Sequence, residues 1–165
     1  MIMFNELKYF INIASWPEQS GGYSYFQQCS NLLEITFPKP TNGRLDRAML
    51  SGCTNLKRAI IMEGVNSIGG QFFYDCTSMQ YIELPSTLAT LRVFSGSSYR
   101  HFYNVPASCA VILKATTPPT AVTDVFTRFS GNVYVPDDSV EAYKAASGWS
   151  IIAARIFPIS EYEGN

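Results

Sequence analysis

The feature that most constrains this chain is a segment of 14 residues that occurs three times, at residues 25–38, 49–62 and 72–85. Each copy has a cysteine at its fifth position. Two small polar residues, a Leu or Met, and a stretch of alternating polar and apolar residues follow. The cysteines Cys29, Cys53 and Cys76 are therefore 24 and 23 positions apart. A repeat of this length indicates a solenoid, in which successive copies stack as coils.

The repeat length lies within the range of about 20–29 residues that is typical of leucine-rich repeats. Alternation after each cysteine predicts a short strand with one face toward the core. Leu88 and Leu91 repeat Val65 and Ile68 at an offset of 23, so each coil has a second apolar edge. We therefore predict a leucine-rich-repeat solenoid: a β-rich fold of short parallel strands stacked in a right-handed coil, closed by a C-terminal helical cap.

The solenoid is expected to cover residues 1–136, with about five irregular repeats. Residues 1–24 form a degenerate first unit, because Leu7 and Phe10 precede Leu32 and Ile35 by 25 positions. The last unit is longer, and its additional residues fall around positions 95–98. Insertions of this kind usually form loops on one face of a solenoid.

Residues 137–165 are expected to form the C-terminal helical cap. Asp138 followed three positions later by Glu141 matches a capping box, so we expect a helix from Ser139 to about Ala146. A solenoid needs such a cover, since its last apolar layer would otherwise face water. The residues predicted to close the core are Trp149, Ile151, Ile152, Ile156 and Ile159.

Charge and hydropathy exclude several classes of partner. The chain has 12 basic and 13 acidic residues, and the basic ones are scattered. A nucleic-acid interface needs a basic patch, so no nucleic-acid partner is expected. No apolar run is long enough to span a bilayer, so we expect no membrane insertion by this segment. The first residues lack the pattern of a signal peptide, and a secretion signal is expected to lie outside this chain.

The cysteine ladder predicts stacked thiols. Cys29, Cys53 and Cys76 would lie one coil apart, at about the 4.8 Å spacing of paired strands. A disulfide between two of them is geometrically allowed, but a ladder of small buried thiols is the favoured interpretation. Their spacing matches no zinc motif, so neither a metal nor a cofactor is expected.

His101 is the single histidine, and Cys109 follows it by eight positions. One interpretation is a nucleophilic Cys109–His101 pair; the other is a surface loop histidine beside a buried thiol. The second is favoured, since a catalytic pair also needs an orienting group and an oxyanion site. We therefore predict that the protein is not an enzyme.

The outward residues of stacked strands form columns, which suit binding. The predicted columns hold Tyr9, Glu34, Arg58 and Tyr81, and Ile11, Thr36, Ile60 and Glu83. Aromatic and Arg residues are enriched where proteins bind one another. Tyr, Thr and Ile also occur on exposed strands for their β propensity alone, so both interpretations remain open.

The chain resembles the BspA-like leucine-rich repeat surface proteins of gut and oral Bacteroidetes. The matching parts are residues 73–85, residues 65–69, and the closing residues 135–144 with Gly148, Trp149 and Ser150. The resemblance implies a cell-surface or secreted protein that binds a protein or glycan on a host or bacterial surface, in some members adhesively. Related repeats also occur in phage-derived proteins. The alternative is therefore a structural spacer or repeat fragment of a longer surface or phage-derived protein.

Overall fold

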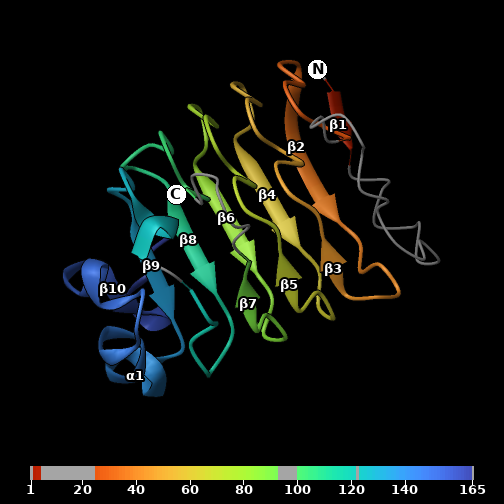
Figure 1. Cartoon of the computed structure of the whole chain (residues 1–165). Coiled ribbons are helices and arrows are strands. Elements are labelled where there is room, and N and C mark those ends of the chain that lie inside the picture. The colour runs from red at the N-terminus through yellow and green to blue at the C-terminus, as the bar shows by residue number, and fades with distance from the viewer. Residues whose placement is uncertain (1, 5–24, 93–99, 122, 165) are drawn as a thin grey trace.

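In the computed structural model, which describes residues 2–4, 25–92, 100–121 and 123–164, the chain winds into a stack of β-coils (Figure 1). One side of the stack is formed by a seven-stranded parallel sheet in the order β1-β2-β4-β6-β8-β9-β10. Another side is formed by a three-stranded parallel sheet in the order β3-β5-β7. The family of folds predicted from the repeat, a β-rich leucine-rich-repeat solenoid, is confirmed.

The elements follow the repeat. The large sheet contains β1 (Ile2–Phe4), β2 (Leu32–Phe37), β4 (Arg58–Ile61), β6 (Tyr81–Leu84), β8 (Ala110–Leu113), β9 (Asn132–Val135) and β10 (Ile156–Pro158). The small sheet contains β3 (Arg44–Leu45), β5 (Ser67–Ile68) and β7 (Thr90–Leu91). The helical segments are η2 (Thr123–Phe126), η3 (Asp137–Ser139), α1 (Val140–Ala145), η4 (Ser150–Arg155) and η5 (Ile159–Glu161).

The predicted register holds between the central strands. Ile35 pairs with Ala59, and Ala59 pairs with Ile82. On the second edge Ile68 pairs with Leu91, as the offset of 23 predicts. These inward residues are buried. The first strand differs from the prediction: β1 pairs with β2, and Met3 stands opposite Glu34 where Tyr9 was expected. Ile2, Met3 and Phe4 are themselves apolar and can form a strand, an option that the alignment of Leu7 with Leu32 overlooked.

A left-handed residue in each turn sets the coil geometry. The residue just before each cysteine of the ladder has a positive φ: Gln28 (60°), Gly52 (75°) and Asp75 (58°). In the next two coils Asn104 (58°) and Arg128 (59°), which precede Val105 and Phe129, have the same conformation. Backbone hydrogen bonds join these turns from coil to coil. The N–H of Gly52 donates to Tyr74 O at 2.8 Å, and that of Asp75 donates to Tyr103 O at 2.9 Å. Because the same strained turn recurs, the coils stack in register.

The cysteine ladder is present as free thiols. All four cysteines lie in the described ranges and none forms a disulfide. Cys53 and Cys76 are fully buried, whereas Cys29 at the start of the ladder is half-buried. The Sγ of Cys53 donates to Phe26 O at 2.9 Å, and that of Cys76 donates to Leu50 O at 3.2 Å. Each thiol therefore bonds the backbone of the neighbouring coil.

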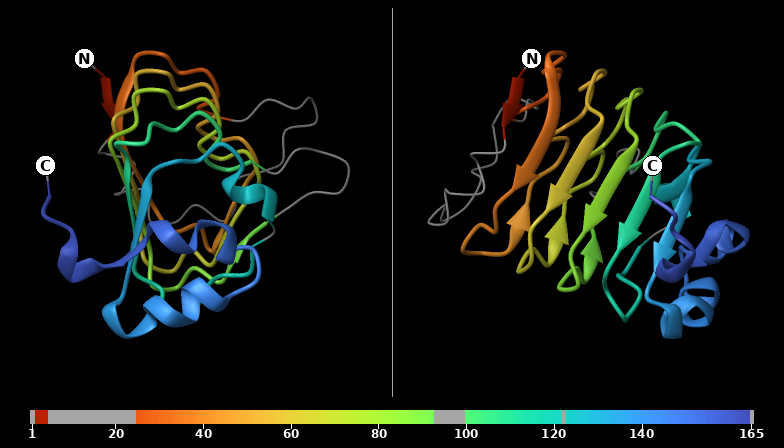
Figure 2. Two further views of the ribbon diagram at one scale, coloured as in Figure 1. Left: turned by 90° about the vertical axis from the view of Figure 1, so that its left-hand side faces the viewer. Right: turned by 180° about the vertical axis from the view of Figure 1, so that it is seen from behind.

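The last coil is covered by a compact segment that contains α1 (Figure 2). Trp149 and Tyr143 are buried, and they donate side-chain hydrogen bonds to Pro119 O and Ala115 O at 2.7 and 2.8 Å. Phe126 lies 4.8 Å from Trp149 between ring centroids, so aromatic rings connect the cover with the core. Of the predicted closing residues, Trp149, Ile152 and Ile156 are buried, Ile159 is half-buried and Ile151 is exposed.

Two details of this segment differ from the prediction. The capping box is absent: α1 begins after the short helix η3, and Ser139 makes no side-chain cap hydrogen bond. Asp137 instead accepts a hydrogen bond from the N–H of Ser160 at 3.2 Å. The segment also contributes a strand, since β10 pairs with β9 and extends the sheet. A cover made only of helices would have left the edge of β9 unpaired.

Candidate binding face

The outward face of the large sheet carries the predicted columns. Glu34 pairs with Arg58 and Arg58 with Tyr81, while Thr36 pairs with Ile60 and Ile60 with Glu83. All six side chains are half-buried. The six therefore form two aligned rows across β2, β4 and β6. Tyr9 and Ile11 lie outside the described residues.

Interactions between neighbouring strands hold these side chains in place. The guanidinium of Arg58 lies 4.2 Å from the centroid of the Tyr81 ring. The Tyr81 hydroxyl donates to Glu83 Oε2 at 2.7 Å, and Lys114 forms an ion pair with the other carboxylate oxygen of Glu83. Arg58 is therefore positioned by an aromatic ring and makes no ion pair with any residue of the described ranges.

The electrostatics of the cluster follow from these contacts. Partial burial raises the pKa of Glu83, and the hydrogen bonds from Lys114 and Tyr81 lower it by more, so the carboxyl titrates below its ordinary range. Burial, and then the hydrogen bond to Glu83, raise the pKa of Tyr81. The phenol therefore remains a donor and the carboxylate an acceptor at neutral pH.

A groove runs along the N-terminal ends of the central strands. It has a volume of about 440 Å³ and is lined by Glu34, Lys57, Arg58, Gln80, Tyr81, Ser108 and Tyr162. Three of the predicted residues thus lie in one groove. Sequence reasoning missed Lys57 and Gln80, which precede their strands, and Tyr162, which lies outside the repeat.

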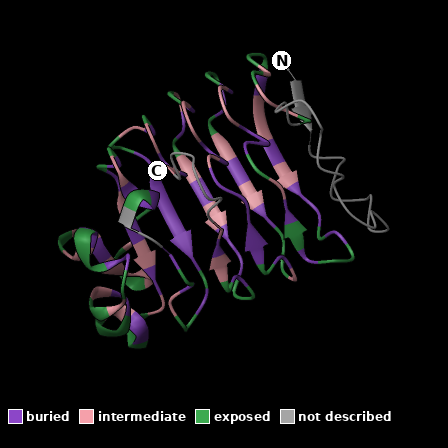
Figure 3. Cartoon of the chain, viewed as in Figure 1, coloured by how far each residue is buried: buried purple, intermediate pink, exposed green. Residues whose placement is uncertain are grey.

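The C-terminal segment covers one part of this face. Its residue Tyr162 lies 6.1 Å from Tyr81 and 5.0 Å from Tyr134 between ring centroids. Strand β8 beneath it is buried along its whole length, including the outward residues Ala110 and Ile112 (Figure 3). The exposed part of the face is therefore mainly the part over β2, β4 and β6.

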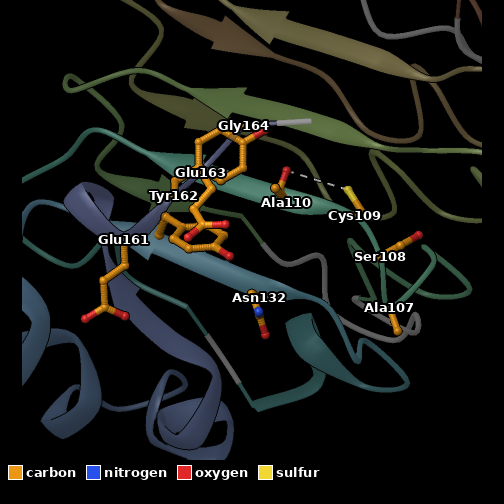
Figure 4. A pocket seen from close by; sticks show the side chains of 10 residues that line it. Ala107, Ser108, Cys109, Ala110, Asn132, Glu161, Tyr162, Glu163 and Gly164 are labelled. Atoms are coloured by element: carbon orange, nitrogen blue, oxygen red, sulfur yellow. Dashed lines mark hydrogen bonds between the residues drawn. The ribbon is translucent and has the colours of Figure 1, made fainter.

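A second, smaller hollow of about 290 Å³ lies on the other side of Tyr162 (Figure 4). Its lining residues are Ala107, Ser108, Cys109, Ala110, Asn132, Tyr134, Glu161, Tyr162, Glu163 and Gly164. Ser108 and Tyr162 line both spaces, so the groove and the hollow adjoin at these two residues.

The residues considered for catalysis are not activated. Burial raises the pKa of Cys109 to about 12, which leaves the thiol protonated at neutral pH. His101 is fully buried rather than on a surface loop, so that part of the prediction is wrong. Burial lowers the pKa of His101 to about 4, and its Nε2 lies 3.2 Å from Arg92 O. Within the described ranges no group of three His, Cys, Asp or Glu side chains could hold a metal ion.

Comparison with known protein families identifies the repeat. The BspA type leucine rich repeat region matches in six copies over residues 9–115, which is more than half of the chain. The chain belongs to the BspA-type leucine-rich repeat family. This is a family of repeat and binding modules whose members are typically surface-associated. No curated protein matches the chain. The described helices are all too short to cross a bilayer.

Proposed function

We propose that this protein is a non-enzymatic binding module, and that the outward face of β2, β4 and β6 binds a protein partner. The observation that carries the proposal is the Arg58–Tyr81 pair, which presents an oriented cation and a half-buried aromatic ring at a groove. Tyr and Arg are the residue types that contribute most at protein interfaces. The family consists of interaction modules, which supports the same use of the fold.

The neighbouring residues support a polar interface. Glu34, Lys57 and Gln80 line the groove beside Arg58, so it offers donors and acceptors around an aromatic centre. Ile60 lies beside Thr36 and Glu83 and provides an apolar contact on the same face. A polar rim around aromatic and apolar residues is the usual composition of a protein interface. We further infer that the protein is displayed at a cell surface or secreted, where the family is typically found.

A binding assay with matched variants tests the proposal. Wild-type protein, Arg58→Ala and Tyr81→Ala would be compared on a panel of purified matrix proteins and glycans. Arg44→Ala changes an exposed arginine of the small sheet, and Tyr74→Ala changes a half-buried tyrosine of a turn, so both serve as controls. We expect each face variant to lose at least about tenfold in affinity while the controls bind like wild type.

Binding that is equal in the face variants and the controls would contradict the proposal. It would favour the alternative function, a structural spacer within a longer surface or phage-derived protein. Binding to a glycan rather than a protein, with the same dependence on Arg58 and Tyr81, would support the proposed binding face but contradict a protein as its partner.

A further inference from the structure

The C-terminal segment occupies a defined position on the binding face. The view along the stack shows this end of the chain on the outer side of the large sheet (Figure 2). Tyr162 contacts Tyr81 of β6 and Tyr134 of β9, the strands on either side of β8. Between them β8 presents Ala110, which pairs with Tyr81 on one side and Asn132 on the other. Tyr134 lies two residues further along β9, opposite Ile112. The small side chain of Ala110 leaves room for the ring of Tyr162 against both tyrosines, and we call this position the tyrosine slot.

Beyond Ser160, the ring of Tyr162 makes the described ring contacts between the segment and the face. Ser160, Glu161, Glu163 and Gly164 are exposed, and a Cβ added to Gly164 would meet no atom within 4 Å. The N–H of Tyr162 bonds Ile159 O within the segment itself. The hydrogen bond from Ser160 N–H to Asp137 lies before the slot. Among the described residues, no hydrogen bond joins residues 161–164 to β6, β8 or β9.

The charges around the slot complement the segment. Glu161 and Glu163 flank Tyr162 and line the hollow on one side (Figure 4). Lys57 and Arg58 line the groove on the other side, and neither forms an ion pair with a described residue. Among the described residues that line that groove, Glu34 is the single carboxylate. An acidic segment that runs from the slot along the groove would therefore reach cations with which residues 161–164 form no ion pair.

We propose that the tyrosine slot is a recognition site for an extended peptide segment of a partner protein, with a tyrosine between acidic residues. The chain's own residues 159–164 occupy the slot until such a segment replaces them. The inference rests on the proposed function, because the partner would bind the same outward face. An internal segment on a short linker acts at a high effective concentration, so a partner needs the additional contacts at Lys57 and Arg58 to compete.

The slot is tested with the chain of residues 1–165 and a fluorescently labelled peptide that has the sequence of residues 159–165. Tyr162→Ala empties the slot, and fluorescence anisotropy then measures binding of the peptide in trans. We expect Tyr162→Ala to bind the peptide at least about tenfold more tightly than wild type does. Tyr74→Ala, which removes a ring elsewhere on the surface, should behave like wild type.

Two further measurements make the test specific. Adding Ala110→Leu to Tyr162→Ala fills the slot and should abolish the gain in peptide binding. A peptide with alanine in place of its tyrosine should not bind. Circular dichroism and thermal unfolding check that each variant is folded.

Equal peptide affinity for wild type and Tyr162→Ala, or no binding to either, would overturn the tyrosine slot. That result is independent of the panel assay, which can still show a partner that depends on Arg58. Conversely, peptide binding without any partner that depends on Arg58 or Tyr81 would contradict the proposed function and leave the slot itself in place.

Discussion

The thiol of Cys76 lies 3.2 Å from the carbonyl oxygen of Leu50 in the preceding coil and donates a hydrogen bond to it. The same carbonyl accepts the N–H of Cys53 at 3.1 Å. One carbonyl is thus shared by a turn of its own coil and by the thiol of the next. A buried carbonyl oxygen without a hydrogen-bond donor would lower the stability of the fold. The thiol of Cys76 and the N–H of Cys53 both donate to this oxygen, so that cost is avoided.

Substitutions of the stacked cysteines distinguish the contribution of core packing to stability from that of the thiol hydrogen bonds. Cys53→Leu adds volume to a site with no exposed surface and should lower the free energy of unfolding by about 1–3 kcal/mol. Cys76→Val removes the thiol donor but leaves Leu50 O bonded to Cys53 N–H, so we expect a loss below about 1 kcal/mol. Urea unfolding curves measure both, and a neutral Cys53→Leu would show that the stack is not tight.

Much of this arrangement could be predicted from the repeat. The pairing of Ala59 with Ile82 and of Ile68 with Leu91 follows from the offset of 23, because equivalent residues of stacked coils must lie side by side. The hydrogen bonds of the thiols could not be predicted, since they depend on which carbonyl the adjacent turn presents. The burial of His101 was missed because polar neighbours in the sequence indicated a loop.

The candidate site was only partly predictable, because some of its residues lie outside the repeat. Arg58 and Tyr81 belong to the repeat, so their alignment could be deduced from spacing. Tyr162 and β10 belong to the non-repeating end, where no second copy shows which face a residue contacts. One signal was present: Ala110 is small at a position where β4 and β6 have Arg58 and Tyr81, which indicates that something covers it.

Thiol accessibility should differ among the four cysteines. Burial raises the pKa of Cys53 and of Cys109 to about 12, and that of Cys76 is also raised well above its ordinary value. Cys29 is the half-buried one. Treatment of the folded protein with a thiol reagent near neutral pH should therefore modify Cys29 first, as read by peptide mass spectrometry.

A control in denaturant should modify all four thiols. Rapid labelling of Cys109 in the folded protein would contradict the structure and would support the alternative of a nucleophilic Cys109–His101 pair.

His101 predicts a pH dependence of stability. Its pKa is lowered from 6.5 to about 4 in the folded state, so the unfolded chain binds a proton that the folded chain does not over this range. The stabilisation is present above pH 6.5 and is lost as the pH falls toward 4. Between about pH 7 and about pH 5 the loss should be about 2 kcal/mol.

His101→Gln provides the matched control between about pH 7 and about pH 5. The amide of glutamine can still donate to Arg92 O, but it does not titrate. Its unfolding free energy should change much less between the same two pH values. Parallel curves for wild type and His101→Gln would show that another group causes the dependence.

The left-handed turn position can be tested at Gly52. Its φ of 75° is strained for a residue with a side chain, and a Cβ there would lie 3.0 Å from Cγ of Gln28. Gly52→Ala should therefore cost about 1 kcal/mol in thermal or chemical unfolding. Gly52→Asn should cost less, because Asn tolerates this conformation better. Equal costs for the two variants would indicate that contact with Gln28 matters more than backbone strain.

Hydroxyl-radical footprinting shows directly whether the outward face of the large sheet binds the partner. The strongest binder from the panel of matrix proteins and glycans would be added, and side-chain oxidation would be measured by mass spectrometry. We expect protection of Tyr81 and Ile60 on this face, with no change at Tyr74 and Tyr103 on the turns. Protection of Tyr74 and Tyr103 with unchanged oxidation of Tyr81 and Ile60 would contradict it.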